Sequence, residues 1–204
     1  MVRAVRERIG PLPLFFMGHS LGGHVAIAAT GSGFVEEPPT GHILLSTNVW
    51  ADSLEPNPIR RLRKSLATRG LELLSRPLGY FPSRLLRFGP SDEAGPYVRA
   101  LARNWHNSRW MSDDFEHDYM ADMSNVTQPT LSVIGKGDRQ MAHHVGARRW
   151  VEYLGTDDLT FWLARKGSFD LDFDPDHMNL VTWTAAKPIW IAIDGWMTRH
   201  INRR

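Results

Sequence analysis

The chain of 204 residues contains no cysteine. A disulfide framework, a zinc–thiolate site and a thiol nucleophile are therefore excluded. The sequence also lacks an apolar run of membrane-spanning length, and its N-terminus shows no secretory signal pattern. These absences are consistent with a reducing compartment, and we expect a cytoplasmic location.

A large excess of charge of one sign is also missing. Lys and Arg number 24 against 22 Asp and Glu, which gives a formal net charge of +2. That excess is too small to predict a nucleic-acid partner. Hydrophobic residues make up 42% and charged residues 23% of the chain, as in ordinary globular proteins. With no internal repeat or low-complexity tract, we expect a single domain over residues 1–204 that can bury a core.

The most informative segment is FFMGHSLGGH at residues 15–24, which is typical of an apolar strand that turns sharply into a helix. It contains G-x-S-x-G in the strand–turn–helix context that this motif requires, with His19 at the variable position. We expect a side chain at Gly18 or Gly22 to collide across the turn, and the turn to expose the Ser20 hydroxyl. A G-K-[ST] ending and G-x-G-x-x-G are absent, so a phosphate-binding loop is disfavoured. The motif predicts a nucleophilic serine that needs a histidine base and a carboxylate elsewhere.

Hydrophobic patterning predicts strands that alternate with helices. The expected strands cover residues 12–17, 42–47, 130–134 and 159–164, and the expected helices cover 2–9, 21–29, 142–153 and 180–200. This order predicts a parallel sheet with right-handed crossovers. Residues 48–125 show no clear strand, and a structureless loop of that length is improbable in a compact domain. We interpret them as a helical cap inserted into a core formed by residues 1–47 and 126–204.

The segments G-H-S-L-G-G, G-Y-F-P-S-R-L-L-R-F-G and D-H-M-N-L-V resemble the α/β-hydrolase family, and more narrowly its bacterial lipase-like and serine aminopeptidase-like members. The resemblance covers the C-terminal two-thirds of such a protein, from the helix before the nucleophile strand onward. It implies an α/β-hydrolase fold with flanking helices, a cap insertion and the catalytic order Ser, acid, His. The family's strands before the nucleophile strand have no counterpart here, so we expect residues 12–17 to form an open sheet edge.

The resemblance implies an acid after the strand at 130–134, where family members carry G-x-x-D. Residues 135–138 read G-K-G-D, so Asp138 is the expected acid. A carboxylate at the end of a strand can accept the imidazole N–H and hold the required tautomer. A turn aspartate is the alternative interpretation. Asp52 is a competing acid, because some lipases of this fold place their acid after the second of the strands seen here.

The expected base is His177, the only histidine on the loop between the last strand and the closing helix. A helix-cap or surface histidine is the alternative interpretation. Four aspartates close to it invite a calcium-binding interpretation: Asp170, Asp172, Asp174 and Asp176. The central glycine and closing glutamate of an EF-hand loop are absent, so we expect no metal and no cofactor.

In the mechanism that the family implies, Ser20 attacks a carbonyl, His177 transfers the proton and Asp138 orients His177. The backbone N–H of Leu21 supplies one oxyanion donor, and the second donor in the family comes from a loop that has no counterpart here. The predicted function is a serine hydrolase that cleaves a small-molecule carboxylic ester or related acyl bond. The alternatives are an acyltransferase or peptidase with the same triad, and a catalytically impaired fragment or non-enzymatic binding protein.

The expected cap has a strongly basic stretch. Its cations are Arg60, Arg61, Arg63, Lys64, Arg69, Arg76, Arg84 and Arg87, against the single acid Glu72. Leucines and aromatic residues lie between them. One interpretation is an amphipathic lid that meets an anionic membrane surface or an acidic substrate. We favour a solvated helix whose arginine stems lie over apolar residues. The sequence does not specify an oligomeric state.

Overall fold

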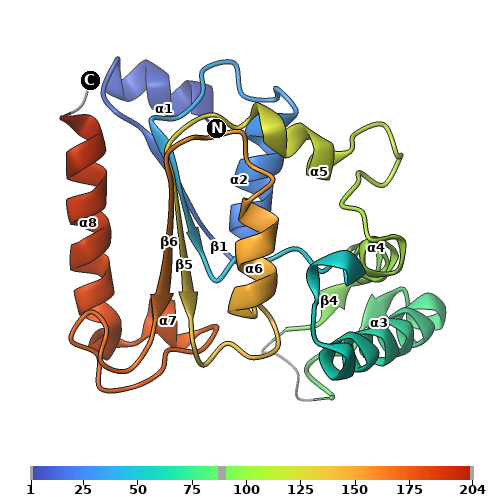
Figure 1. Ribbon diagram of the computed structural model, residues 1–204. Coiled ribbons are helices and arrows are strands. Elements are labelled where there is room, and N and C mark those ends of the chain that lie inside the picture. Colours follow the sequence, from blue (N-terminus) through green and yellow to red (C-terminus); the bar gives the residue numbers. More distant parts are fainter. Residues whose placement is uncertain (1, 87–90, 203–204) are drawn as a thin grey trace. The chain divides into compact units, whose positions relative to one another are not determined.

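The computed structural model describes residues 2–86 and 91–202 (Figure 1). Contacts divide the chain into two compact units, which we call the core unit (Met1–Val49 and Ala121–Arg204) and the inserted unit (Trp50–Met120). The predicted role of the inserted unit as a cap stays a prediction. Arg87 and Phe88, at the end of the predicted basic stretch, lie outside the described residues.

The core unit contains a four-stranded sheet in which every neighbouring pair is parallel. The strands are β1 (Phe15–His19), β2 (Gly41–Leu45), β5 (Thr130–Gly135) and β6 (Leu159–Ala164). Their order is β1-β2-β5-β6, so β1 lies at one edge of the sheet that the described residues form. The predicted α/β class and parallel sheet are confirmed.

One face of the sheet is covered by α8 (Lys187–Ile201), which runs alongside the strands in Figure 1. Ile189 and Ile193 of this helix belong to one buried cluster with Ile43 and Leu131 of the two central strands. All of these side chains are at most 1% exposed. Burial of each such aliphatic side chain contributes about 1.5–3 kcal/mol, so this layer supplies much of the stability of the core unit.

The opposite face is covered by α2 (Leu21–Gly31) and α6 (His144–Val151) (Figure 1). Ala147 of α6 packs on Ile134 of β5 in a second buried cluster. Because helices cover both faces, β2 is buried along its whole length, as expected for a central parallel strand. The first helix, α1 (Val2–Ile9), has no buried residue.

The inserted unit is built on two helices, α3 (Pro58–Leu78) and α4 (Gly95–Asn107), which pack against each other. Between them lies an antiparallel pair of two-residue strands, β3 (Tyr80–Phe81) and β4 (Glu93–Ala94). The expectation of no strand in this region is therefore wrong. Gly79 ends α3 with a left-handed backbone (φ 74°), which turns the chain into β3.

The other helical segments are single turns. They are η1 (Asp52–Leu54), α5 (Tyr119–Asp122), η2 (Met123–Asn125), α7 (Asn179–Thr182) and η3 (Thr184–Ala186). Over residues 2–86 and 91–202, no helix combines the length and the apolar character needed to cross a membrane.

Two boundaries differ from the sequence prediction because of prolines. The first strand begins at Phe15 rather than at residue 12, since Pro13 has no N–H to donate to a ladder. The predicted closing helix over 180–200 is interrupted, because Trp183 is extended (ψ 136°) and Pro188 lies in the first turn of α8. Proline fits the start of a helix, where its missing N–H has no partner to lose.

Two histidines of the core unit have a strongly lowered pKa. His42 of β2 is 0% exposed, and His24 of α2 packs edge-on against Trp150 at 5.6 Å between ring centroids. Burial lowers the pKa of each histidine to about 4, against the opposing effects of the Asn48 backbone on His24 and of the Gln128 side chain on His42. Both rings are therefore neutral in the folded protein at neutral pH.

The free energy of unfolding should fall as the pH drops from 6.5 toward 4. In that window the unfolded chain takes up protons that the folded chain does not, at a cost of about 3 kcal/mol for each histidine. Urea unfolding at pH 7, 5.5 and 4.5 measures this slope. His42→Gln should make this slope shallower, because glutamine takes up no proton in either state. Parallel curves for wild type and His42→Gln would contradict the assignment.

Candidate active site

Ser20 lies between β1 and α2 in a backbone conformation that residues other than glycine seldom adopt, with φ 51° and ψ −117°. Its N–H donates to the Leu45 carbonyl at 2.9 Å, and its carbonyl accepts from the Gly23 N–H at 3.0 Å. The side chain forms no capping hydrogen bond to α2. Such backbone strain is concentrated at functional sites, so the conformation of Ser20 makes it a candidate functional residue.

The glycines around Ser20 differ in how much space they have. A Cβ at Gly18 would overlap the backbone of Gly22 and Gly23, as expected for a tight elbow. A Cβ at Gly22 would meet nothing within 4 Å, so the predicted collision at Gly22 is wrong. Gly22 faces open space in the first turn of α2, and the restricted position is Gly23, where a Cβ would overlap the Thr47 side chain.

Asp138 follows β5 and is only 4% exposed. Its Oδ1 accepts the backbone N–H groups of Met141 at 3.1 Å and Ala142 at 2.9 Å. Its Oδ2 lies 2.6 Å from Nδ1 of His177. Because two N–H groups hold one oxygen, the other oxygen is fixed in the direction of the imidazole ring, which is the geometry expected of an orienting carboxylate.

Glycines in the acid loop allow the loop that bears His177 to come close. A Cβ at Gly135 would overlap the Pro175 carbonyl, and one at Gly137 would press on the same backbone. The Gly137 N–H instead donates to the Pro175 oxygen at 2.8 Å. Sequence reasoning assigned a role only to Asp138 in this motif, although the repeated glycine directly before it was the available signal for close packing.

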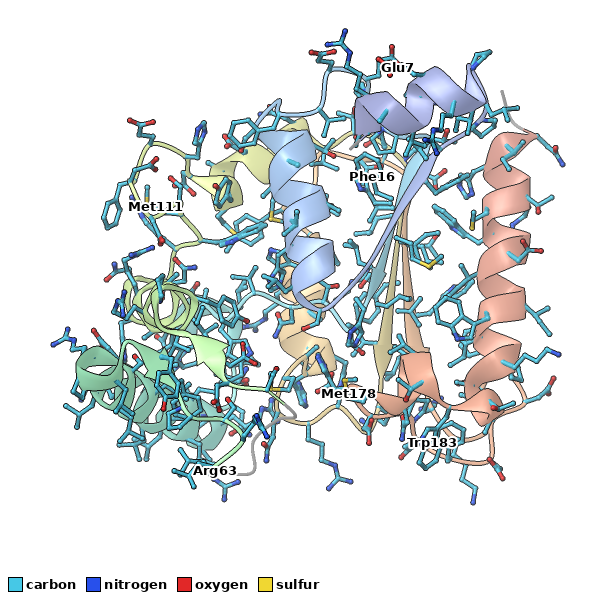
Figure 2. All side chains as sticks on the ribbon, turned by 180° about the vertical axis from the view of Figure 1, so that it is seen from behind. Glu7, Phe16, Arg63, Met111, Met178 and Trp183 are labelled. Atoms are coloured by element: carbon cyan, nitrogen blue, oxygen red, sulfur yellow. The ribbon has the colours of Figure 1, made fainter. Side chains whose placement is uncertain are left out.

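His19 connects the elbow to the loop of His177. Its Nε2–H donates to the His177 carbonyl at 2.8 Å, and the two rings are 4.8 Å apart between centroids. Burial is the largest influence on His19 and lowers its pKa, which favours the neutral ring. Figure 2 shows Met178, the next residue after His177, near the lower end of the core unit. The hydrogen bond from His19 to the loop of His177 was not predicted from the sequence.

The alternative acid has a different partner. The Asp52 carboxylate forms an ion pair with Arg61 at 3.1 Å inside the inserted unit, whereas the carboxylate paired with His177 is that of Asp138. Near His177, Asp176 accepts the backbone N–H groups of Met178 and Asn179, which is ordinary turn chemistry. Throughout the described ranges, no group of three His, Cys, Asp or Glu residues is arranged to hold a metal ion.

Comparison with known families assigns the chain to one of them. Residues 1–185 match the model described as the alpha/beta hydrolase family. The chain belongs to this family. A search of curated protein sequences finds no significant match.

Solved α/β-hydrolase structures resemble the chain in fold at low sequence identity. A monoacylglycerol lipase from Paleococcus ferrophilus has a TM-score of 0.57 at 18% identity and covers 98% of this chain and 73% of its own. An esterase from Pyrococcus furiosus has a TM-score of 0.53 at 12% identity, and the match covers 99% of this chain and 59% of the esterase. A soluble variant of monoglyceride lipase from Saccharomyces cerevisiae has a TM-score of 0.58 at 14% identity, and the match covers 97% of this chain and 65% of the lipase. The chain therefore spans about 60–70% of the length of these α/β-hydrolases.

The two glycines of the elbow provide a matched pair of substitutions. Gly18→Ala should lower the free energy of unfolding by about 1–3 kcal/mol, because the added methyl overlaps fixed backbone. Gly22→Ala should leave it unchanged or raise it by about 0.5–1 kcal/mol, since alanine stabilises a helix that has room for it. Urea unfolding of both variants measures the difference. Equal losses in the two variants would contradict the geometry of the turn.

Proposed function

We propose that this protein is a serine hydrolase that cleaves carboxylic esters through an acyl-enzyme. The observation that carries the proposal is the 2.6 Å contact between Asp138 and Nδ1 of His177. With Nδ1–H donated to the carboxylate, Nε2 of His177 carries the lone pair and can take the proton of Ser20. Ser20 then attacks the ester carbonyl, and His177 returns the proton to the departing alkoxide.

The developing oxyanion needs donors that are oriented before the reaction. The N–H of Leu21 opens the first turn of α2, where the helix leaves its N–H groups unpaired and carries partial positive charge. This group follows the nucleophile directly, as the elbow mechanism requires. In the second half-reaction, His177 takes a proton from water, the resulting hydroxide attacks the acyl-enzyme, and Ser20 is released with its proton restored.

The choice of an ester over an amide rests on the comparisons. The similar solved structures are described as a monoacylglycerol lipase, an esterase and a monoglyceride lipase. Acyltransferases and peptidases can use the same three residues with a different acceptor or leaving group. Assays with a p-nitrophenyl ester and the matching p-nitroanilide, with and without an alcohol acceptor, separate these reactions.

Ser20→Ala should abolish both labelling by a fluorophosphonate and hydrolysis of p-nitrophenyl butyrate, because only an activated serine reacts with either reagent. In-gel fluorescence and absorbance measure the two losses. The exposed Ser124 is the control, and Ser124→Ala should keep both activities. Labelling that survives in Ser20→Ala would overturn the nucleophile, and an unreactive wild type would favour the impaired or binding protein.

Asp138→Asn should lower kcat by about 10³ to 10⁴, because an amide at this position favours the wrong imidazole tautomer. Asp52→Asn is the matched control, since its carboxylate pairs with an arginine instead of the histidine. Its kcat should stay within about twofold of wild type, as expected for loss of one half-exposed ion pair. Steady-state ester hydrolysis by the two variants decides the question. The reverse pattern would assign the acid to Asp52.

A further inference from the structure

The helix α3 has its polar and apolar sides reversed relative to an ordinary surface helix. Its buried residues are Lys64, Thr68 and Ser75, all polar. Its most exposed apolar residues are Ile59 at 63%, Leu62 at 60%, Leu66 at 61% and Leu73 at 72%. The leucines therefore do not lie beneath the arginine stems, contrary to the interpretation that we favoured from the sequence.

Partners on the buried side hold α3 in this orientation. Lys64 forms an ion pair with Glu55 at 3.5 Å, and its ammonium lies 5.0 Å from the Trp50 ring centroid and 5.6 Å from that of Trp105. The Trp105 indole N–H donates to the Ser65 hydroxyl at 2.9 Å. Rotation of α3 to bury its leucines would break each of these interactions and leave a buried charge unpaired, which is costly. The apolar side is thus held outward.

The exposed aliphatic residues share one side of α3. Spacings of three, four and seven residues place Ile59, Leu62, Leu66 and Leu73 on the same side of the helix, over about 21 Å of its length. Isolated exposed leucines need no explanation, but several exposed aliphatic side chains on one side of a helix indicate an interaction surface.

The positive charge on α3 favours an anionic partner. The helix carries six cations (Arg60, Arg61, Arg63, Lys64, Arg69 and Arg76) and one acid (Glu72). Four of these cations form ion pairs: Arg60 and Lys64 with Glu55, Arg61 with Asp52 and Arg76 with Glu72. At about 100° of rotation per residue, Arg63 lies on one side of the exposed aliphatic residues and Arg69 on the other. Both are exposed, and neither forms an ion pair within the described part of the chain. Figure 2 shows Arg63 extending outward from the α3 ribbon.

A set of exposed aliphatic side chains flanked by free arginines matches the chemistry of a phospholipid interface. Leucines enter the boundary between headgroups and acyl chains, while guanidinium groups remain at the level of the phosphates. Each cation near an anionic leaflet adds to the attraction. A second copy of the chain fits less well, because two such faces would bring their arginines together.

We propose that the face of α3 formed by Ile59, Leu62, Leu66, Leu73, Arg63 and Arg69 docks on an anionic phospholipid surface. The proposal is independent of ester hydrolysis, because none of these residues belongs to the candidate active site. It predicts both an apolar and an electrostatic contribution to binding, and each can be removed separately.

Co-sedimentation with 100-nm vesicles tests the proposal. The full chain should partition at least tenfold more strongly onto phosphatidylcholine vesicles that contain 25% phosphatidylglycerol than onto pure phosphatidylcholine, and 0.5 M NaCl should weaken this binding. Leu62→Gln with Leu66→Gln, and separately Arg63→Gln with Arg69→Gln, should each lower the partition coefficient at least tenfold. Circular dichroism and unfolding midpoints establish that the variants are folded.

Matched controls lie on α8 of the core unit. Ile191→Gln removes an isoleucine that is 63% exposed, and Arg199→Gln removes an exposed arginine, so both should bind vesicles as wild type does. Absence of wild-type binding to anionic vesicles would overturn the proposal, as would full binding by both double variants. A dimer in light scattering that Leu62→Gln with Leu66→Gln converts to monomer would assign the face to a second copy instead.

Discussion

The candidate site depends on the close approach of two loops, one after β5 and one that carries His177. The backbone contact between Gly137 and Pro175 brings the loops together, and the absence of side chains at Gly135 and Gly137 makes the contact sterically possible. Because the two loops lie this close together, Oδ2 of Asp138 reaches the imidazole while Oδ1 stays bound to backbone N–H groups. The acid and the base are therefore positioned mainly by main-chain contacts, which substitutions on the surface do not alter.

The parallel sheet brings the rest of the site to the same place, because parallel strands end at a common edge. Ser20 follows β1 directly, and Asp138 follows β5 after a short loop. The strained turn at Ser20 persists because its surroundings determine it, through the hydrogen bond to Leu45 and the packing of Gly23 on Thr47. Within the described sheet, β1 has β2 as its one strand neighbour. The contacts on the β2 side therefore contribute more to holding the turn at Ser20 than they would beside a central strand.

Features with a local physical cause were predictable from the sequence. The β6 strand was predicted over its observed range, since an apolar run between turn residues has few other solutions, and the elbow was evident because a strand, a glycine and a serine meet in one short segment. Features decided by distant residues were not predictable. The two-residue strands β3 and β4 are too short for a periodicity, and the hydrogen bond from His19 to His177 joins residues 158 positions apart. The pairing of Asp138 with His177, proposed from motif order, has the geometry that its role requires, but the role itself stays a prediction.

The orientation of α3 shows why hydrophobic pattern alone was misleading there. Burial of one leucine stabilises a fold by about 1.5–3 kcal/mol, so leaving four aliphatic side chains exposed forgoes a large gain. Burial of Lys64 with Glu55 adds a desolvation cost that the ion pair offsets only in part. A chain selected for stability alone would reverse both choices, with leucine at the buried positions and lysine or glutamate outside. Evolution retains such a loss of folding stability where the exposed surface has a function. The same reasoning links the strained Ser20 and the outward leucines: each is a local departure from the most stable arrangement, held in place by well-satisfied neighbours.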